Sequence, residues 1–354
     1  MQAKGVIVVP ATDRLEGRWL DATHATALQR VANRPIVCHV LAAFAAAGVT
    51  EAVLLTPPEI AEEIELCLRA EGTSGVEVAP LVHDYRADPA GAVAALAERV
   101  GDAPVIVHRA NGLLGQPLAP FLELVADDSP DVVLLVTQGA RNTERLAPAS
   151  QQMLRIVEMD PANAGFGVAG VCVLGSGALR SARAVRWSAE GLELEAMAED
   201  LAEHGGTLQV RMVRSWRAFA GDVGDLLAVN RTVLDALADG ANPPETDGNR
   251  FEGRVLIDPT ASISSSVICG PVIVGAGAHV ADSYIGPHTS IGERVRVEGA
   301  EIERSIVLAG ASIVHVGGRL VASVVGREAR IFRDFSVPRA IRLQVGDGDE
   351  VALC

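Results

Sequence analysis

In residues 255–305 the chain repeats a 17-residue pattern three times, as VLIDPTASISSSVICGP, VIVGAGAHVADSYIGPH and TSIGERVRVEGAEIERS. Apolar residues recur at the same places in each copy, and the 17-residue step continues toward the C-terminus. The three series are Ile257, Val274, Ile291, Leu308 and Val325; Ile263, Val280, Val297, Val314 and Ile331; and Ile268, Ile285 and Ile302. One inward side chain every five or six residues predicts a three-sided parallel β-solenoid, in which each coil buries its apolar residues against the next.

Residues 1–240 alternate between buried-strand patterns and amphipathic helix patterns, which predicts an α/β domain with a mostly parallel, doubly wound sheet. The predicted strands are Gly5–Val9, Ala52–Leu55, Val76–Pro80, Val105–His108, Val132–Val136 and Gly170–Leu174. The predicted helices are Ile36–Ala47, Ile60–Arg69, Ala90–Val100, Leu118–Ala126 and Leu194–His204. Residues 241–253 are polar and turn-rich, so we expect a linker there and a second domain over residues 254–354.

The composition is that of a globular protein, with 49% hydrophobic residues and a formal net charge of -15. So acidic a chain is a poor partner for the phosphate backbone of a nucleic acid. The five cysteines (Cys38, Cys67, Cys172, Cys269 and Cys354) form no C-x-x-C pair, so we expect neither a zinc site nor a disulfide framework, and no cofactor. No secretory leader pattern and no apolar run of about 20 residues is found, which favours a cytoplasmic protein without membrane contact.

The first predicted strand leads into Pro10-Ala11-Thr12-Asp13. A turn that cradles a triphosphate needs several inward backbone N–H groups and a close approach of the main chain, which glycine permits. Pro10 has no N–H to donate, and the Cβ of Ala11 hinders the approach. We therefore predict that this loop does not bind a triphosphate.

Four segments point to one family. Residues 31–36 read VANRPI before a predicted helix, and Trp216 is followed by Gly221 and by Asn230-Arg231. Residues 282–292 read DSYIGPHTSIG, and residues 338–347 read PRAIRLQVGD. Together they resemble the long form of the glucose-1-phosphate thymidylyltransferases over essentially the whole chain. The resemblance implies a Rossmann-like, GT-A-like domain with a mixed sheet, followed by a left-handed parallel β-helix.

The resemblance also implies a reaction, in which a sugar-1-phosphate attacks the α-phosphate of dTTP with Mg²⁺ held by two aspartates. In this chain the aspartate positions fall on Asn111 and Phe219, and the two family lysines fall on Thr26 and Met159. Phenylalanine cannot ligate Mg²⁺, which takes oxygen ligands. Loss of one transition-state donor typically lowers a rate by about 10²–10³. Several such losses predict a degenerate homologue without a metal site.

The candidate catalytic residues in the cleft are Asp13, Arg14, His108, Arg109 and Asn111. His108 and Arg109 end a predicted central strand, where doubly wound sheets bind ligands. The candidate substrate contacts are Glu158, Glu193, Trp216 and Phe219; the two glutamates fall on positions that contact the sugar in the family. Residues 83–86 are interpreted as a solvated loop. The histidines of the solenoid are interpreted as surface residues, with a role in coenzyme A-dependent acyl transfer as the alternative.

Three functions stay open. The first is a degenerate homologue that acts as a regulatory or structural partner of an active paralogue. The second is an enzyme with new chemistry on a specialised metabolite, which would bind a small molecule in the remodelled N-terminal cleft. The third is a divergent but active sugar-1-phosphate nucleotidyltransferase. The family forms oligomers and parallel solenoids associate side by side, so we expect a homo-oligomer through the β-helix.

Overall fold

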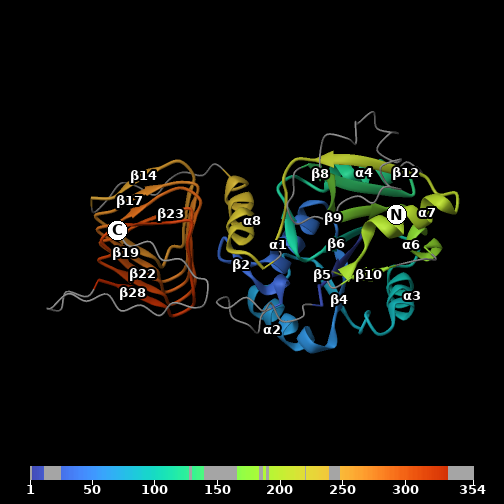
Figure 1. Cartoon of the computed structure of the whole chain (residues 1–354), viewed down its shortest axis with the longest axis horizontal. Coiled ribbons are helices and arrows are strands. Elements are labelled where there is room, and N and C mark those ends of the chain that lie inside the picture. Colours follow the sequence, from blue (N-terminus) through green and yellow to red (C-terminus); the bar gives the residue numbers. More distant parts are fainter. Residues whose placement is uncertain are drawn as a thin grey trace, which may run out of the picture.

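The computed structural model describes residues 2–11, 25–126, 130–138, 166–182, 186–188, 191–219, 221–238 and 248–333. Figure 1 shows an α/β part (blue to yellow) beside a solenoid (orange to red). The α/β part is built on one seven-stranded sheet in the order β12-β8-β9-β6-β1-β4-β5. Its strands are β1 (Lys4–Val8), β4 (Glu51–Thr56), β5 (Glu77–Val82), β6 (Val105–Arg109), β8 (Val132–Gln138), β9 (Phe166–Leu174) and β12 (Leu208–Val213). Only β9 runs antiparallel to its neighbours in this sheet, so the sheet is mixed, as the resemblance implies.

Helices cover both faces of this sheet. They are α1 (Ile36–Ala46), α2 (Ala61–Glu71), α3 (Pro89–Val100), α4 (Ala119–Ala126), α6 (Ala178–Ser181), α7 (Leu194–Glu203) and α8 (Val223–Asp235), with 3₁₀ turns η1 (Thr26–Leu28) and η2 (Pro58–Ile60). Phe44 of α1 and Val229 of α8 belong to one apolar layer, and Leu96 of α3 and Met197 of α7 to the other. Every predicted strand and helix is present, and α6, α8 and β12 are additional elements that the sequence pattern did not indicate.

Among the described residues, three short antiparallel pairs lie outside this sheet. They are β2 (Arg30–Val31) with β3 (Arg34–Pro35), β7 (Gly112–Leu114) with β13 (Trp216–Ala218), and β10 (Trp187–Ser188) with β11 (Gly191–Leu192). The turn between β2 and β3 consists of Ala32 and Asn33, both with positive φ (44° and 65°). Positive φ at both central residues is the geometry of a tight two-residue hairpin.

The solenoid consists of three five-stranded parallel sheets, in agreement with a left-handed β-helix. The first holds β14 (Arg250–Glu252), β17 (Val267–Cys269), β20 (Tyr284–Ile285), β23 (Glu301–Glu303) and β26 (Arg319–Val321). The second holds β15 (Val255–Ile257), β18 (Val272–Val274), β21 (Thr289–Ile291), β24 (Ile306–Val307) and β27 (Val324–Val325). The third holds β16 (Ser262–Ser264), β19 (His279–Ala281), β22 (Arg296–Glu298), β25 (Ser312–Val314) and β28 (Arg330–Phe332).

The 17-residue period fails in the fourth coil. Ile291 pairs with Val307, and Val307 is the buried residue, so the prediction of Leu308 as the inward residue was wrong. The turn before β24 contains only residues 304–305, whereas the equivalent turn before β21 contains residues 286–288. One missing turn residue shifts the register by one and sends alternate side chains to the opposite face. Leu308 instead packs against the apolar layer of the α/β part.

The same shift makes Ile313 the inward residue of β25, and the prediction of Val314 was also wrong. The next two turns together restore the register. The turn at residues 315–318 is two residues longer than the turn at residues 299–300, and the turn at residues 322–323 is again one residue shorter than the turn at residues 286–288. As a result Ile331 and Val325 return to their expected places in the ladder.

Strand β14 lies inside the range that the sequence predicted as the linker, and it pairs with β17 of the solenoid. The division into domains at residues 240 and 254 stays a prediction. Over the described ranges, no helix combines the length and the apolar character that a membrane crossing requires.

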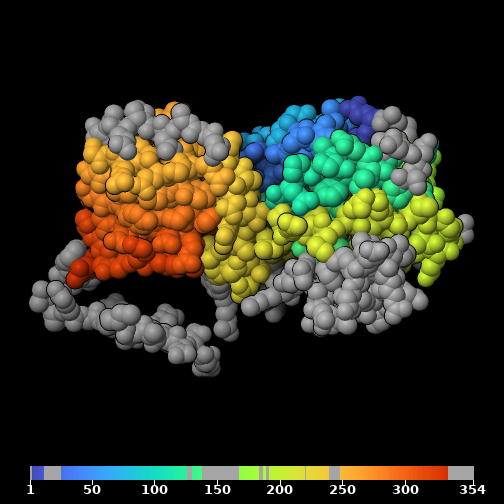
Figure 2. Space-filling model, turned by 90° about the horizontal axis from the view of Figure 1, so that it is seen from above, coloured from blue at the N-terminus to red at the C-terminus, as the bar shows by residue number. Residues whose placement is uncertain are grey.

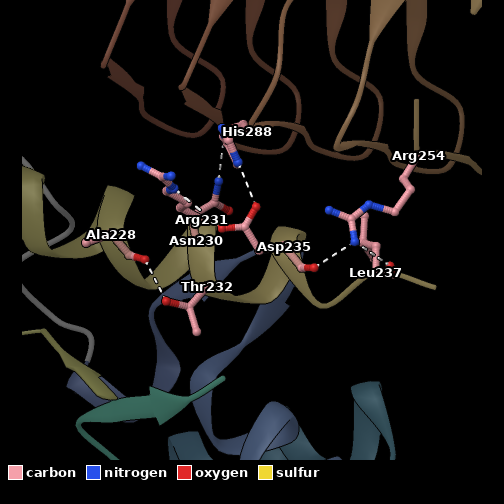
Figure 3. A network of polar contacts seen from close by, with 8 residues as sticks. All are labelled: Ala228, Asn230, Arg231, Thr232, Asp235, Leu237, Arg254 and His288. Carbon is pink, nitrogen blue, oxygen red and sulfur yellow. Dashed lines mark hydrogen bonds and ion pairs between the residues drawn. The ribbon is translucent and has the colours of Figure 1, made fainter. Parts of the chain in front are cut away.

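Helix α8 lies between the α/β part and the solenoid (Figures 1 and 2). Its Asn230 is fully buried: the side-chain oxygen accepts from Ala32 N–H (2.7 Å) and from the Ser290 hydroxyl (2.7 Å), and the amide donates to the His288 carbonyl (3.3 Å). Figure 3 shows that His288 also meets Asp235, at 2.8 Å between Nε2 and Oδ1. One buried amide thus joins the β2–β3 hairpin, α8 and the solenoid.

Candidate functional site

Val9 and Ala11, which follow β1, are hydrogen-bonded to a tyrosine from a distant part of the chain. The Tyr85 hydroxyl donates to the Val9 carbonyl (2.9 Å) and accepts from Ala11 N–H. The side chain is only 1% exposed, and burial raises the pKa of the phenol above its usual range. The Ala11 N–H, which a phosphate-binding turn would direct at its ligand, is therefore already paired inside the protein.

A second aromatic ring packs against Tyr85. Trp187 of β10 stacks on Tyr85, with ring centroids 4.6 Å apart and an interplanar angle of 20°. In β11, Gly191 has φ +105°, and a Cβ there would lie 2.8 Å from Val8 Cγ1. Only glycine fits such an approach without strain. The β10–β11 hairpin therefore sits directly against the end of β1.

The sequence did not predict the stacking of Tyr85 on Trp187. Residues 83–86 were interpreted as a solvated loop, and this was wrong for Tyr85, which is buried. Tyr85 follows β5, whereas its partners follow β1 and lie in β10, so the contact joins three separate segments. Aromatic residues make up only 3% of the chain. Because a large ring contributes most when it is buried, each of these few rings was a candidate for a buried contact.

His108 and Arg109 end β6, as predicted, but their side chains belong to different layers. The His108 ring lies 6.2 Å from the Phe44 ring and 5.6 Å from the Trp216 ring, and its Nδ1 meets the Arg109 carbonyl at 2.7 Å. Burial lowers the pKa of His108 to about 4. The imidazole is therefore neutral at physiological pH.

Arg109 is buried on the opposite side of the sheet, near Cys172. Burial raises the pKa of the Cys172 thiol to about 12, and the positive charge of Arg109 partly offsets this rise. Because successive strand residues point to opposite faces, the two neighbours cannot act on one ligand from the same side. A role of either residue as a candidate catalytic group stays a prediction.

Asn111 and Phe219 lie side by side. Phe219 N–H donates to the Asn111 carbonyl (2.7 Å), next to the β7–β13 pair. Trp216 is buried beneath them, and a Cβ on Gly170 would lie 2.6 Å from its ring and 3.0 Å from Asn111 Oδ1. The structure therefore brings together three of the sequence-predicted site residues, including the two that fall on the family's metal positions.

These two positions do not fit Mg²⁺. The Phe219 side chain is 3% exposed and offers no oxygen, and Asn111 offers at most a neutral carbonyl. Over the described ranges, no three His, Cys, Asp or Glu side chains come together as a metal site.

The remaining candidates divide into two groups. Glu193 follows β11 directly and precedes α7, and it is half-buried; its N–H donates to the Arg186 carbonyl (3.0 Å). It thus adjoins the hairpin that carries Trp187. Asp13, Arg14 and Glu158 lie outside the described residues.

A cavity of about 410 Å³ opens on the α1 side of the sheet. His108 lines it together with His39, Ala43, Leu113, Pro117 and Val233. Because Nδ1 of His108 is held by the Arg109 carbonyl, Nε2 is the nitrogen that a ligand in this cavity would meet.

Comparison with known proteins identifies the family. A model described as nucleotidyl transferase matches residues 20–146. The glucose-1-phosphate thymidylyltransferase of Streptomyces griseus is 30% identical over 335 residues, which cover 92% of this chain and 93% of that protein. The chain belongs to this family. The enzyme of the same name from Streptomyces antibioticus is 27% identical and covers 94% of this chain and 95% of its own length.

A solved structure agrees with this assignment at the level of the fold. It is a putative glucose-1-phosphate thymidylyltransferase from Bacillus anthracis in complex with a sucrose. Its TM-score is 0.51 at 17% identity, and the match covers 68% of this chain and 98% of that one. The chain therefore has the fold of this family.

Proposed function

We propose that this chain is a catalytically degenerate member of the family, which does not carry out Mg²⁺-dependent nucleotidyl transfer and acts as a partner or regulator of an active relative. The single observation that carries the proposal is the commitment of the Ala11 N–H to the Tyr85 hydroxyl. A nucleotide phosphate that bound to the Ala11 N–H would have to break this buried pairing, and the stacking on Trp187 helps to hold Tyr85 in it. Each buried polar group left without a partner costs about 1–3 kcal/mol.

The Asn111–Phe219 pair supports the same proposal. A cation that neutralises the triphosphate would meet one neutral carbonyl and one apolar ring there. Electrostatic stabilisation of the transition state is usually the largest catalytic contribution, and each missing donor lowers a rate by about 10²–10³. The proposal therefore rests on two separate places in the cleft, neither of which favours a charged nucleotide.

The direct test is a pyrophosphate-release assay with glucose-1-phosphate, dTTP and Mg²⁺. We expect no release above background, with the Streptomyces griseus relative as the positive control. Turnover at an ordinary enzyme rate, about 1–10³ s⁻¹, would end the proposal in favour of a divergent active nucleotidyltransferase.

The partner role has its own test. An active family member from the same organism is assayed with and without a stoichiometric amount of this chain, and the mixture is analysed by size-exclusion chromatography. We expect co-elution and a changed rate or nucleotide affinity. Separate elution with an unchanged rate would leave the degenerate cleft standing and remove the regulatory role.

One observation favours a second candidate, an enzyme with new chemistry on a specialised metabolite. The neutral His108 ring lines the 410 Å³ cavity among mostly apolar residues, and a neutral imidazole can accept a proton. Thermal-shift measurements with apolar metabolites, compared between the wild type and a His108→Gln variant, would distinguish this candidate from the partner role.

A further inference from the structure

A small cavity of about 70 Å³ lies where the β2–β3 hairpin meets the solenoid. The hairpin contributes Arg30 and Asn33, and the coil turns contribute residues 292–294, 308–309 and Arg327. Figure 1 places β2 at this junction, beside α8. Three arginines from two parts of the molecule thus surround one opening, in a chain whose net charge is -15.

Arg30 is held in place on the hairpin side. Its Nη1 donates to the Asn33 carbonyl (2.6 Å), its Nη2 pairs with Glu71, and its side chain is 22% exposed. Asn33 in turn donates from Nδ2 to the Ile291 carbonyl of the solenoid (2.7 Å). The guanidinium is therefore preorganised at the cavity, and its position is coupled to the docking of the hairpin on the coils.

Arg294 and Arg327 face the cavity from two different coil turns of the solenoid. Arg294 is largely exposed, and its ion pair with Glu293 is loose, at 3.8 Å. Arg327 is exposed and forms no hydrogen bond or ion pair with any of the described residues. Glu71 and Glu293 offset part of the positive charge, which leaves one guanidinium in excess: three arginines against two carboxylates.

The size and the donors define the ligand chemistry. A guanidinium presents a fork of N–H donors that matches the oxygens of a phosphate group. Since a water molecule occupies about 30 Å³, the cavity has room for one tetrahedral anion, and any larger part of the ligand must extend into solvent. We propose that this junction binds a phosphate group, free or carried by a small metabolite, between Arg30 on one side and Arg294 and Arg327 on the other.

Such a ligand bridges the hairpin and the solenoid. It binds the docked arrangement and has no equivalent site in the unfolded chain, so it raises the unfolding temperature by a few degrees at concentrations well above its Kd. The site is separate from the nucleotide cleft, and its occupancy is measured without any assay of catalysis.

Isothermal titration and thermal unfolding test this site with inorganic phosphate, pyrophosphate and glucose-1-phosphate at low ionic strength. We expect saturable binding that weakens about tenfold in Arg327→Gln and in Arg294→Gln, because each variant removes a charged hydrogen-bond donor. The matched control is Arg330→Gln, since Arg330 is exposed in the same coil and lies over the Phe332 ring; its Kd should equal that of the wild type.

The ligand source follows from the same titrations. Equal affinity for inorganic phosphate and glucose-1-phosphate indicates free phosphate, and at least tenfold tighter binding of the sugar phosphate indicates a phosphorylated metabolite. Absence of saturable binding for all three anions, or binding that both arginine variants leave unchanged, overturns the site. Neither result bears on the degenerate cleft, which is tested by pyrophosphate release.

Discussion

The Tyr85 hydroxyl bonds to both backbone groups that flank Pro10, the Val9 carbonyl and the Ala11 N–H. Removal of this one oxygen atom should therefore destabilise the protein. In Tyr85→Phe the Val9 carbonyl and the Ala11 N–H lose their partner while the ring still stacks on Trp187. We expect the free energy of unfolding to fall by about 1–3 kcal/mol, as measured by denaturant titration. A variant as stable as the wild type would show that the hydroxyl does not hold the loop.

His108 predicts a pH dependence of stability. Burial lowers its pKa from 6.5 to about 4, so between these values the unfolded chain binds a proton that the folded protein does not. The stabilising contribution is complete above pH 6.5 and is lost as the pH falls toward 4. The slope is about 1.4 kcal/mol per pH unit. In His108→Gln, unfolding titrations from pH 7 to 5 should show a shallower loss, and an identical slope would contradict this.

At the scale of elements, α8 carries the largest predicted effect. Asn230→Ala removes three hydrogen bonds at a fully buried position, to Ala32, Ser290 and His288. We expect a loss of about 2–4 kcal/mol in the free energy of unfolding, because several buried groups are left without partners. Arg231→Ala, on the exposed side of the same helix, is the control and should change stability by less than about 0.5 kcal/mol. Equal effects of the two substitutions would remove the linking role of Asn230.

The strands of the solenoid were predictable from the sequence, except for the inward residues of the fourth coil. The 17-residue period predicted the solenoid, because inward β-branched residues in neighbouring coils must stack. It could not predict that Val307 and Ile313 replace Leu308 and Val314, since each pair consists of adjacent apolar residues and only turn length decides between them. Helix α8 was not predicted. In the sequence its polar Asn230 indicates a surface position, whereas in the structure Asn230 is buried and bonds to Ser290 of the solenoid.

For the whole molecule, the sequence predicted the arrangement of sheet, helices and solenoid, but not the side-chain contacts at the end of β1. Alternating strand and helix patterns are local, and they indicated the α/β sheet correctly. The contacts of Tyr85 with Ala11 and Trp187 join residues far apart in the chain, so no window of sequence contains them. The Asn111–Phe219 contact was predictable only through the resemblance, which assigns both positions to one metal.

Asn111 and Phe219 stand where the resemblance places two metal-binding aspartates, so both can be replaced by aspartate together. In the double variant Asn111→Asp/Phe219→Asp, a metal-ligating pair would stand where the backbone hydrogen bond already joins the two positions. We expect no pyrophosphate release from dTTP and glucose-1-phosphate, because the Ala11 N–H stays paired with Tyr85 and Pro10 still offers no donor. A carboxylate at a position that is 3% exposed should also lower stability, so folding is verified first by circular dichroism. Robust turnover by the folded double variant would mean that the first loop does not exclude the nucleotide, and that the missing metal ligands alone had silenced the cleft.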